Sequence, residues 1–395
     1  MKLFQLFRKY LAIVGTEPLQ AFQKNHSMIM FLKRLSVLIV LIACLIFSTV
    51  FFGYEAKTIG EYADSFYASA DLTITLLLFA IILRKMDSLF KWFDDFENII
   101  GQRMENPKSK STYVKLNENI EKWTGVFYSI IVELSVIAVL MPHLIISFYL
   151  YFATDLGREA FSLPFQVWTP FDWRTPIGYL IIFTFECSAA YYTTHMAACC
   201  IGILVASCCI IFTFCNEINS EIHALDESNK AEEYSVEPKK RVADMVEFHA
   251  TAKQLVFDMD DIYAFIVIGY FLWSLSTICC NLLLIQIESE RGEGIDPLQM
   301  IKPLFQTFWS FAVLFLICEF GQTLTNHFDQ LKDVIYDCDW TAFPKDMQKI
   351  LPIIIQNTQR PVVLQICEDF SCSRESFKKV VNAGFSFFMV FREFR

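Results

Sequence analysis

The sequence predicts an all-α membrane protein with seven transmembrane helices and an additional helical part in the cytosol. Of the 395 residues, 54% are hydrophobic and only 19% are charged, and the mean hydropathy is +0.40, which is too apolar for a soluble domain of this length. Windows long enough to cross a bilayer of about 30 Å recur along the chain. The basic residues are concentrated in alternate connecting segments, which indicates a fixed orientation in the membrane.

Six apolar windows precede the C-terminal region and predict the first six spans. They cover residues 35–53, 66–83, 126–152, 177–215, 262–287 and 304–325. The fourth window holds 39 residues, so it is either one long helix or a hairpin of two helices. We favour one long, tilted helix, because the window contains no Pro and because a hairpin would weaken the bias of the basic residues.

The seventh span, residues 375–394, is the least apolar. Lys379, Asn382, Ser386 and Glu393 follow one another at steps of three, four and seven, which places them on one face of a helix. A polar face on a spanning helix lies against protein or water. Two interpretations remain open: a helix buried in its own bundle, and the wall of a water-filled pore.

The Lys and Arg residues predict an inverted orientation, with a cytoplasmic N-terminus and an extracellular C-terminus. With seven spans, 24 of them lie in the inner segments and 5 in the outer loops. This orientation is the reverse of that of a G-protein-coupled receptor. The predicted divisions are a cytoplasmic amphipathic N-terminal segment (1–34), helices one to six (35–325), a cytoplasmic anchor (326–374) and helix seven (375–395).

Amphipathic patterns continue beyond the membrane windows. Residues 245–259 and 328–335 carry apolar residues at helical spacing, and 347–355 is apolar but too short to span a bilayer. These segments predict a compact cytosolic helical anchor, with a locally folded loop as the alternative. Residues 224–241, rich in Glu and Lys, predict a mobile solvated linker. Apolar residues near the N-terminus, broken by Arg8 and Lys9, predict a helix at the membrane interface.

The composition and motifs exclude several classes of function. The formal net charge of -10, without a clustered basic face, argues against binding of nucleic acid. The six histidines show no zinc-protease spacing, the paired cysteines are adjacent rather than two apart, and no phosphate loop is present. The sequence therefore predicts neither an enzyme nor a resident cofactor or metal.

Polar groups at membrane depth require a partner or a cavity. In the predicted orientation, Asp71, His143 and Glu186 all lie in the outer half of the membrane, among many aromatic residues. Such a combination is typical of a small-molecule pocket, although aromatic belts and core packing give the same pattern. The candidate ligand-binding residues are Tyr67, Asp71, His143, Phe148, Tyr149, Glu186, Tyr191, Tyr192, Phe308 and Trp309. Glu133 and Glu319, nearer the cytoplasmic side, predict interhelical hydrogen bonds.

The C-terminal stretch resembles the insect odorant receptor family. Three stretches carry the resemblance: Gln359-Arg360-Pro361, Ser376-Phe377 and residues 382–388, Asn-Ala-Gly-Phe-Ser-Phe-Phe. Phe385 and Phe387 stand where the family pattern usually has Tyr. The inverted seven-span layout, the long fourth helix and the cytosolic extensions are also similar.

The resemblance implies an odorant-binding subunit of a ligand-gated, non-selective cation channel. Its partners would be a shared coreceptor, membrane lipid and a small volatile, aromatic or apolar odorant, and its place would be the plasma membrane of a sensory neuron dendrite. The last helix would line the pore, with the gate at Val390, Phe394 near the outer mouth, and Ser386 and Glu393 on the same wall. Odorants would bind between helices two, three, four and six in the outer half of the membrane.

Two alternatives remain at this stage. The related gustatory receptors carry a last-helix pattern whose spacing matches Ser386-Phe387, five residues, then Glu393-Phe394. A secondary transporter is less well supported, because the chain shows no repeated halves with interrupted helices.

Overall fold

The computed structural model describes residues 4–16, 24–128, 130, 132, 135–154, 157–230, 238–290, 297–339, 341, 345–358, 361–367 and 370–393. These residues are almost entirely helical. The helices are α1 (Gln5–Ile13), α2 (Lys24–Tyr54), α3 (Ile59–Arg103), α4 (Pro107–Tyr128), α5 (Ser135–Ala153), the 3-10 helix η3 (Gly157–Ala160), α6 (Pro176–Lys230), α7 (Pro238–Glu290), α8 (Pro297–Asp337), α9 (Lys345–Thr358) and α10 (Arg374–Glu393). Two short strands, β1 (Gln365–Cys367) and β2 (Phe370–Ser371), pair antiparallel before α10.

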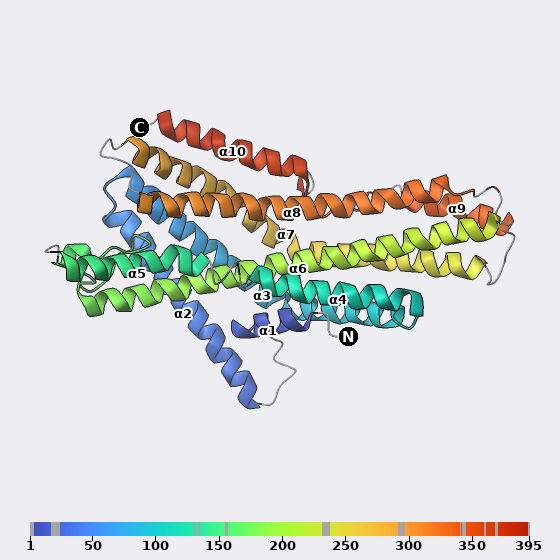
Figure 1. Ribbon diagram of the computed structural model, residues 1–395, viewed down its shortest axis with the longest axis horizontal. Helices are drawn as coiled ribbons and strands as arrows, with labels where there is room; N and C mark the ends of the chain where they lie inside the picture. The colour runs from blue at the N-terminus through green and yellow to red at the C-terminus, as the bar shows by residue number, and fades with distance from the viewer. Residues whose placement is uncertain are drawn as a thin grey trace.

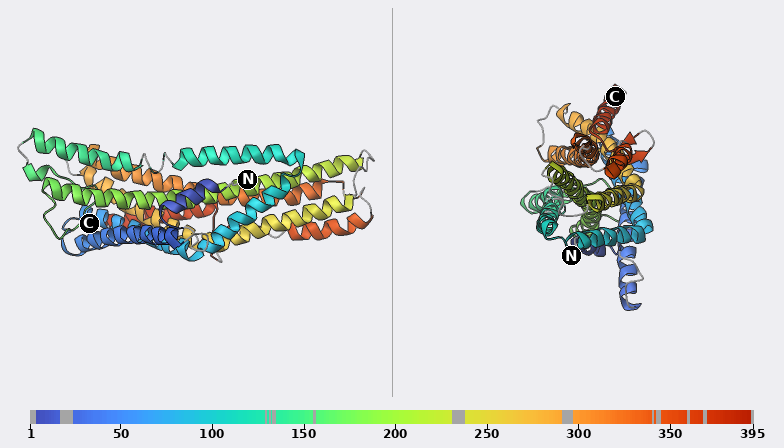
Figure 2. Two further views of the ribbon diagram at one scale, coloured as in Figure 1. Left: turned by 90° about the horizontal axis from the view of Figure 1, so that it is seen from below. Right: turned by 90° about the vertical axis from the view of Figure 1, so that its right-hand side faces the viewer.

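The molecule is an elongated bundle in which α6, α7 and α8 run most of its length (Figure 1). Helices α2, α3, α6, α7 and α8 are long and apolar enough to cross a membrane, and α5 contributes a shorter apolar stretch, Leu140–Ala153. The start of α2 projects from the bundle (Figure 2) and exposes apolar side chains such as Met28 and Phe31. The predicted all-α, multi-span membrane fold is therefore confirmed, whereas its orientation in the bilayer stays a prediction.

The fourth window forms one helix, as predicted. Helix α6 has 55 residues, and 78% of its most apolar window is buried inside the protein. A helix that is apolar around its whole circumference is stable when other helices surround it, and α6 contacts α1, α2, α3, α4, α5, α7 and α8. It therefore forms the centre of the bundle.

One half of the bundle consists of helix extensions beyond the membrane windows. The amphipathic segments 245–259 and 328–335 continue α7 and α8 without a break, as the periodicity predicted, and 347–355 lies in α9. The indole N–H of Trp92 donates to the Leu255 carbonyl at 3.1 Å, and the Tyr113 hydroxyl donates to Glu217. The prediction of a mobile linker over 224–241 was wrong at both ends, because α6 continues to Lys230 and α7 begins at Pro238.

The N-terminal helix α1 does not place its apolar face at the membrane interface, so that prediction was wrong. Phe4, Phe7 and Leu11 are at most 1% exposed. The Phe4 ring stacks on Phe93 with ring centroids 4.3 Å apart, and Phe7 packs against α6. The apolar face is satisfied by protein rather than lipid, because α3 and α6 leave a complementary surface between them.

Helix α10 lies at the edge of the bundle beside α7 and α8 (Figures 1 and 2). Its buried side consists of Ser376, Val380 and Gly384, spaced four residues apart. At Gly384 the backbone approaches α7 so closely that an added Cβ would lie 2.9 Å from the Ile278 side chain. The missing side chain therefore sets the distance between α10 and the bundle.

Candidate ligand cavity and last helix

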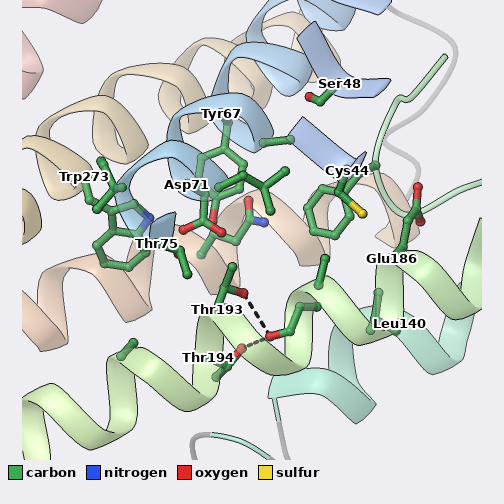
Figure 3. A pocket seen from close by; sticks show the side chains of 18 of the residues that line it. Cys44, Ser48, Tyr67, Asp71, Thr75, Leu140, Glu186, Thr193, Thr194 and Trp273 are labelled. Atoms are coloured by element: carbon green, nitrogen blue, oxygen red, sulfur yellow. Dashed lines mark hydrogen bonds between the residues drawn. The ribbon is translucent and has the colours of Figure 1, made fainter. Parts of the chain in front are cut away.

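A cavity of about 150 Å³ lies among the helices in the half of the molecule that holds α2 and α5 (Figure 3). Helices α2, α3, α5, α6, α7 and α8 all contribute to its wall, together with Phe165 and Val167 from the segment between η3 and α6. Most of the wall is apolar. An engineered cavity of about this volume binds benzene, so the space suits one small ring or a short chain.

The wall residues follow helical faces. On α6 they are Glu186, Ala189, Ala190, Thr193, Thr194 and Ala197; on α3 they are Tyr67, Ala68, Asp71, Leu72, Ile74, Thr75 and Leu78; on α8 they are Phe305, Gln306, Trp309 and Val313. Steps of three and four dominate each set, because residues at those spacings share one face of a helix. Tyr270 and Trp273 complete the wall from α7.

The segment between η3 and α6 closes one side of the cavity and is held there by polar contacts. Lys302, near the start of α8, forms an ion pair with Asp64 of α3 at 2.6 Å and donates to the Pro164 carbonyl at 2.6 Å. Its ammonium also lies 4.4 Å from the centroid of the Phe165 ring. The Trp168 backbone N–H donates to the Phe47 carbonyl at 3.0 Å. These contacts join three helices and the covering segment.

Four of the ten predicted ligand-binding residues line this cavity: Tyr67, Asp71, Glu186 and Trp309. They come from three helices, and Figure 3 shows Tyr67 and Asp71 on one side and Glu186 on another. Their inclusion agrees with the expectation that polar and aromatic groups converge in this half of the chain. That any of them contacts a ligand stays a prediction.

The other six predicted residues lie away from the cavity wall. Tyr149 and Phe308 are 66% and 69% exposed. The remaining four make other contacts. His143 Nδ1 lies 3.5 Å from the Ser162 hydroxyl, and Phe148 packs against Phe161 and Tyr179. Tyr191 stacks on His195, and Tyr192 packs against the main hydrophobic core. Tyr191 and Tyr192 are five and six residues beyond Glu186, which places them on other faces of α6.

Several polar residues of the wall were missed at the sequence level, namely Thr75, Thr193, Thr194, Trp273 and Gln306. Thr193 and Thr194 lie seven and eight residues after Glu186, and Gln306 lies three residues before Trp309. The helical spacing from the residues already chosen was therefore the signal that identifies them.

The predicted pore residues lie on the exposed side of α10. Ser386, Glu393 and Val390 are all exposed, the last at 49%, while Phe394 lies outside the described residues. Lys379 and Asn382, also on the predicted polar face, are exposed too. The polar face is not covered by this chain, so the interpretation of a face buried in its own bundle was wrong. Whether the face lines a pore stays a prediction.

Glu319 forms the interhelical contact that the sequence predicted. Its carboxylate pairs with Arg374 at the start of α10, with nitrogen–oxygen distances of 2.5 and 2.8 Å. The contact ties α10 to α8 where α10 begins. Glu133, for which the same role was expected, lies outside the described residues.

Comparison with known proteins identifies the family. A family model described as 7tm Odorant receptor matches residues 58–385. The chain belongs to this odorant receptor family. The region matched extends from the start of α3 into α10 and includes the cavity walls contributed by α3, α5, α6, α7 and α8. The family is one of receptors and not of enzymes.

Individual members of the odorant receptor family are distant in sequence. The chain is 23% identical over 245 residues to the putative odorant receptor 85d of Drosophila melanogaster, a match covering 60% of this chain and 56% of the relative. It is 26% identical over 145 residues to the odorant receptor coreceptor of Harpegnathos saltator, covering 37% and 29%. The chain thus spans about half the length of the first of these relatives, and less of the coreceptor.

The fold of this odorant receptor family member matches solved structures along its whole length. The olfactory receptor OR5 of Machilis hrabei, solved in complex with eugenol, superposes with a TM-score of 0.79 at 11% sequence identity, covering 100% of this chain and 99% of that one. A second structure of the same receptor, whose description names no ligand, superposes with a TM-score of 0.76. At this identity the similarity establishes the fold. This odorant receptor family member is a multi-pass membrane protein.

Proposed function

We propose that this chain is the odorant-binding subunit of a ligand-gated, non-selective cation channel that assembles with a coreceptor. The observation that supports the proposal best is the pairing of two features in one half of the molecule. One is the mainly apolar cavity among the helices, and the other is the uncovered polar face of α10. The relatives named coreceptors and the receptor solved with eugenol add support from the same family.

In this proposal, the uncovered face of α10 becomes a pore wall when subunits assemble. Ser386, Val390, Glu393 and Phe394 would lie along that wall, with Val390 as the apolar constriction. Asn382 and Ser386 supply polar groups one turn apart, and the Ser386 hydroxyl donates to the Asn382 carbonyl at 2.8 Å. Hydrophobic constrictions between polar rings gate ion flow by excluding water. The chain would act at the plasma membrane of sensory neuron dendrites.

Ligand binding would act on α10 through α7 and α8. Tyr270 and Trp273 of α7 line the cavity, and Ile278, which contacts α10 at Gly384, lies eight residues beyond Tyr270 and five beyond Trp273 on the same helix. A ligand that binds more tightly to the open arrangement shifts the population toward it by its difference in affinity between the two states. Apolar burial would supply most of the binding free energy, with the polar wall groups selecting among ligands.

The test is whole-cell current in cells that express this chain with and without an insect odorant coreceptor, during exposure to a panel of small volatiles. A cation current that requires ligand, chain and coreceptor together supports the proposal. Absence of current for the whole panel, with surface delivery confirmed and a positive-control receptor responding, counts against it.

Two adjacent aromatic residues provide a matched pair of variants for the same assay. Trp309 lines the cavity, whereas its neighbour Phe308 is 69% exposed and lies outside the cavity wall. Trp309→Ala is expected to reorder the responses across the panel by tenfold or more for individual ligands, because it changes the shape of the wall. Phe308→Ala is expected to leave the order unchanged. Equal effects of the two substitutions would contradict the assignment of the cavity as the ligand site.

A further inference from the structure

The polar part of the cavity wall offers hydrogen-bond acceptors that have no donor. Glu186 is 4% exposed, and among the described residues neither of its carboxylate oxygens has a hydrogen-bond partner. The side-chain carbonyl oxygen of Gln306, at 8% exposure, also lacks one. Buried acceptors without donors are uncommon and costly in folded proteins. Both side chains line the cavity, so a molecule inside it is placed to supply the missing donors.

The hydroxyl groups of the wall do not supply these donors. Thr193 and Thr194 both donate to the Ala190 carbonyl, at 2.9 and 2.6 Å (Figure 3). The Ser48 hydroxyl contacts the Ser65 carbonyl at 3.1 Å and the Ser69 hydroxyl at 2.9 Å, both on α3 and outside the cavity wall. Because each hydroxyl has one proton to give, Thr193 and Thr194 present only acceptor lone pairs to the cavity.

The nearby N–H groups are also engaged or directed elsewhere. The ammonium of Lys302 is bound to Asp64 and to the Pro164 carbonyl, both at 2.6 Å, and forms no ion pair with Glu186. Among the described residues, no N–H group, that of Phe165 included, donates a hydrogen bond to the Glu186 carboxylate oxygens. The indole N–H of Trp273 has no hydrogen-bond partner among the described residues, and it points toward the other carboxylate of the wall, that of Asp71, rather than toward Glu186 (Figure 3).

We propose that the ligands of this cavity are small apolar primary amines, whose ammonium group donates to the Glu186 carboxylate and to the Gln306 side-chain oxygen. An ammonium group carries three N–H donors and one positive charge, so it satisfies several acceptors and neutralises one carboxylate. The pair is neutral overall, which suits a buried site. The volume of about 150 Å³ limits the apolar part to a single ring or a short chain. This inference names the ligand class of the site in the proposed receptor function and rests on that function.

Three probes of nearly equal size test the ligand class: benzylamine, benzyl alcohol and ethylbenzene. They differ only in the group at the end of the side chain, which is amine, hydroxyl or methyl. Currents are recorded from cells that express the full chain with the coreceptor. The half-maximal concentration of benzylamine is expected to be at least tenfold below that of ethylbenzene, because a hydrogen bond to a charged group accounts for a factor of that size or more.

Substitutions then assign the effect to the carboxylate. Glu186→Gln is expected to raise the half-maximal concentration of benzylamine at least tenfold and to leave that of ethylbenzene within threefold. Glu227→Gln, the same change at an exposed position of α6 outside the cavity, is the matched control and is expected to change neither. Gln306→Met removes the second acceptor and is expected to weaken the benzylamine response alone, which provides a test that does not depend on the folding of the Glu186 variant.

The possible results separate this inference from the proposed function. Currents to ethylbenzene or benzyl alcohol that equal or exceed those to benzylamine would overturn the amine assignment and leave the receptor function standing. If no probe gives a current, thermal unfolding of the purified chain with its coreceptor is measured with benzylamine. Stabilisation that Glu186→Gln removes supports the amine assignment and counts against the channel function. Absence of stabilisation overturns the assignment.

Discussion

The ion pair between Lys302 and Asp64 is predicted to be a main stabilising contact of the cavity cover. Its nitrogen–oxygen distance is 2.6 Å, and each side chain is only 14% exposed. The pair links α8 to α3, and the additional hydrogen bond to Pro164 fixes the covering segment. Removing one partner leaves the other as a buried charge without compensation, and such changes cost about 3–5 kcal/mol. Because the pair is not fully buried, we expect a loss of about 3 kcal/mol for Lys302→Met.

A double-mutant cycle measures this contribution. The variants are Lys302→Met, Asp64→Leu and the combination of both, and the readout is the free energy of unfolding of the purified chain in micelles with increasing sodium dodecyl sulfate. The double variant has no unpaired charge. Its loss of unfolding free energy is therefore expected to be smaller than the sum of the losses in the two single variants, by about 2 kcal/mol or more. The pair formed by Lys85 and Asp261 is the matched control.

The control pair has the same residue types and the same separation of 2.6 Å, and it also extends from α3. Its side chains are 31% and 68% exposed, so a coupling of at most about 1 kcal/mol is expected. Losses at Lys302 and Asp64 that add within about 0.5 kcal/mol would refute the reasoning, because residues that do not interact behave in this way. A coupling equal to that of the exposed pair would refute the role assigned to burial.

Three further substitutions test packing and hydrogen bonding. Phe7→Ala removes a ring that is 1% exposed and is expected to lower the free energy of unfolding by about 3 kcal/mol. Trypsin is expected to cleave α1 faster in this variant. Unchanged cleavage would contradict the role of Phe7 in holding α1 against the bundle. Tyr113→Phe deletes the hydroxyl that donates to Glu217 and is expected to cost about 1–2 kcal/mol of unfolding free energy, whereas a neutral effect would show that other donors replace it. Gly384→Ala places a Cβ 2.9 Å from Ile278. If the chain forms the proposed channel, this substitution is expected to change its open probability at normal surface expression, with recovery in the double variant that also carries Ile278→Ala. A defect that the second change does not relieve would argue against the contact.

The positions of five membrane helices were predictable from the sequence, whereas α10, the predicted seventh span, is not among the described helices that are long and apolar enough to cross a membrane. Each of the windows 35–53, 66–83, 177–215, 262–287 and 304–325 lies within one helix, because a bilayer imposes a minimum apolar length that is visible in the residues alone. The third window, 126–152, covers the end of α4 and α5, and the described residues between them, 130 and 132, are π-helical. The small paired strands before α10 have no comparable signal, because a strand of two or three residues is too short to show a period.

In the candidate site, the sequence predicted two of the charged wall residues but not the rotation of the helices that carry the aromatic ones. Asp71 and Glu186 were found because charged residues in apolar helices require an explanation. The choice between Phe308 and Trp309 needed the rotation of α8 about its axis, since both are aromatic and adjacent. Phe4 and Phe7 carried an amphipathic pattern that fits lipid and protein equally well.

The sequence by itself therefore determined that most of this protein lies in a membrane, and it also determined the long central helix, the polar face of the last helix and the family resemblance. The tertiary structure decided which residues surround the cavity, that α1 packs into the bundle and that the polar face of α10 remains uncovered. The physical reason is that apolar length and periodicity are local properties of the chain. Helix rotation and the space left between helices depend on contacts between residues far apart in sequence, such as Lys302 with Asp64 and Gly384 with Ile278.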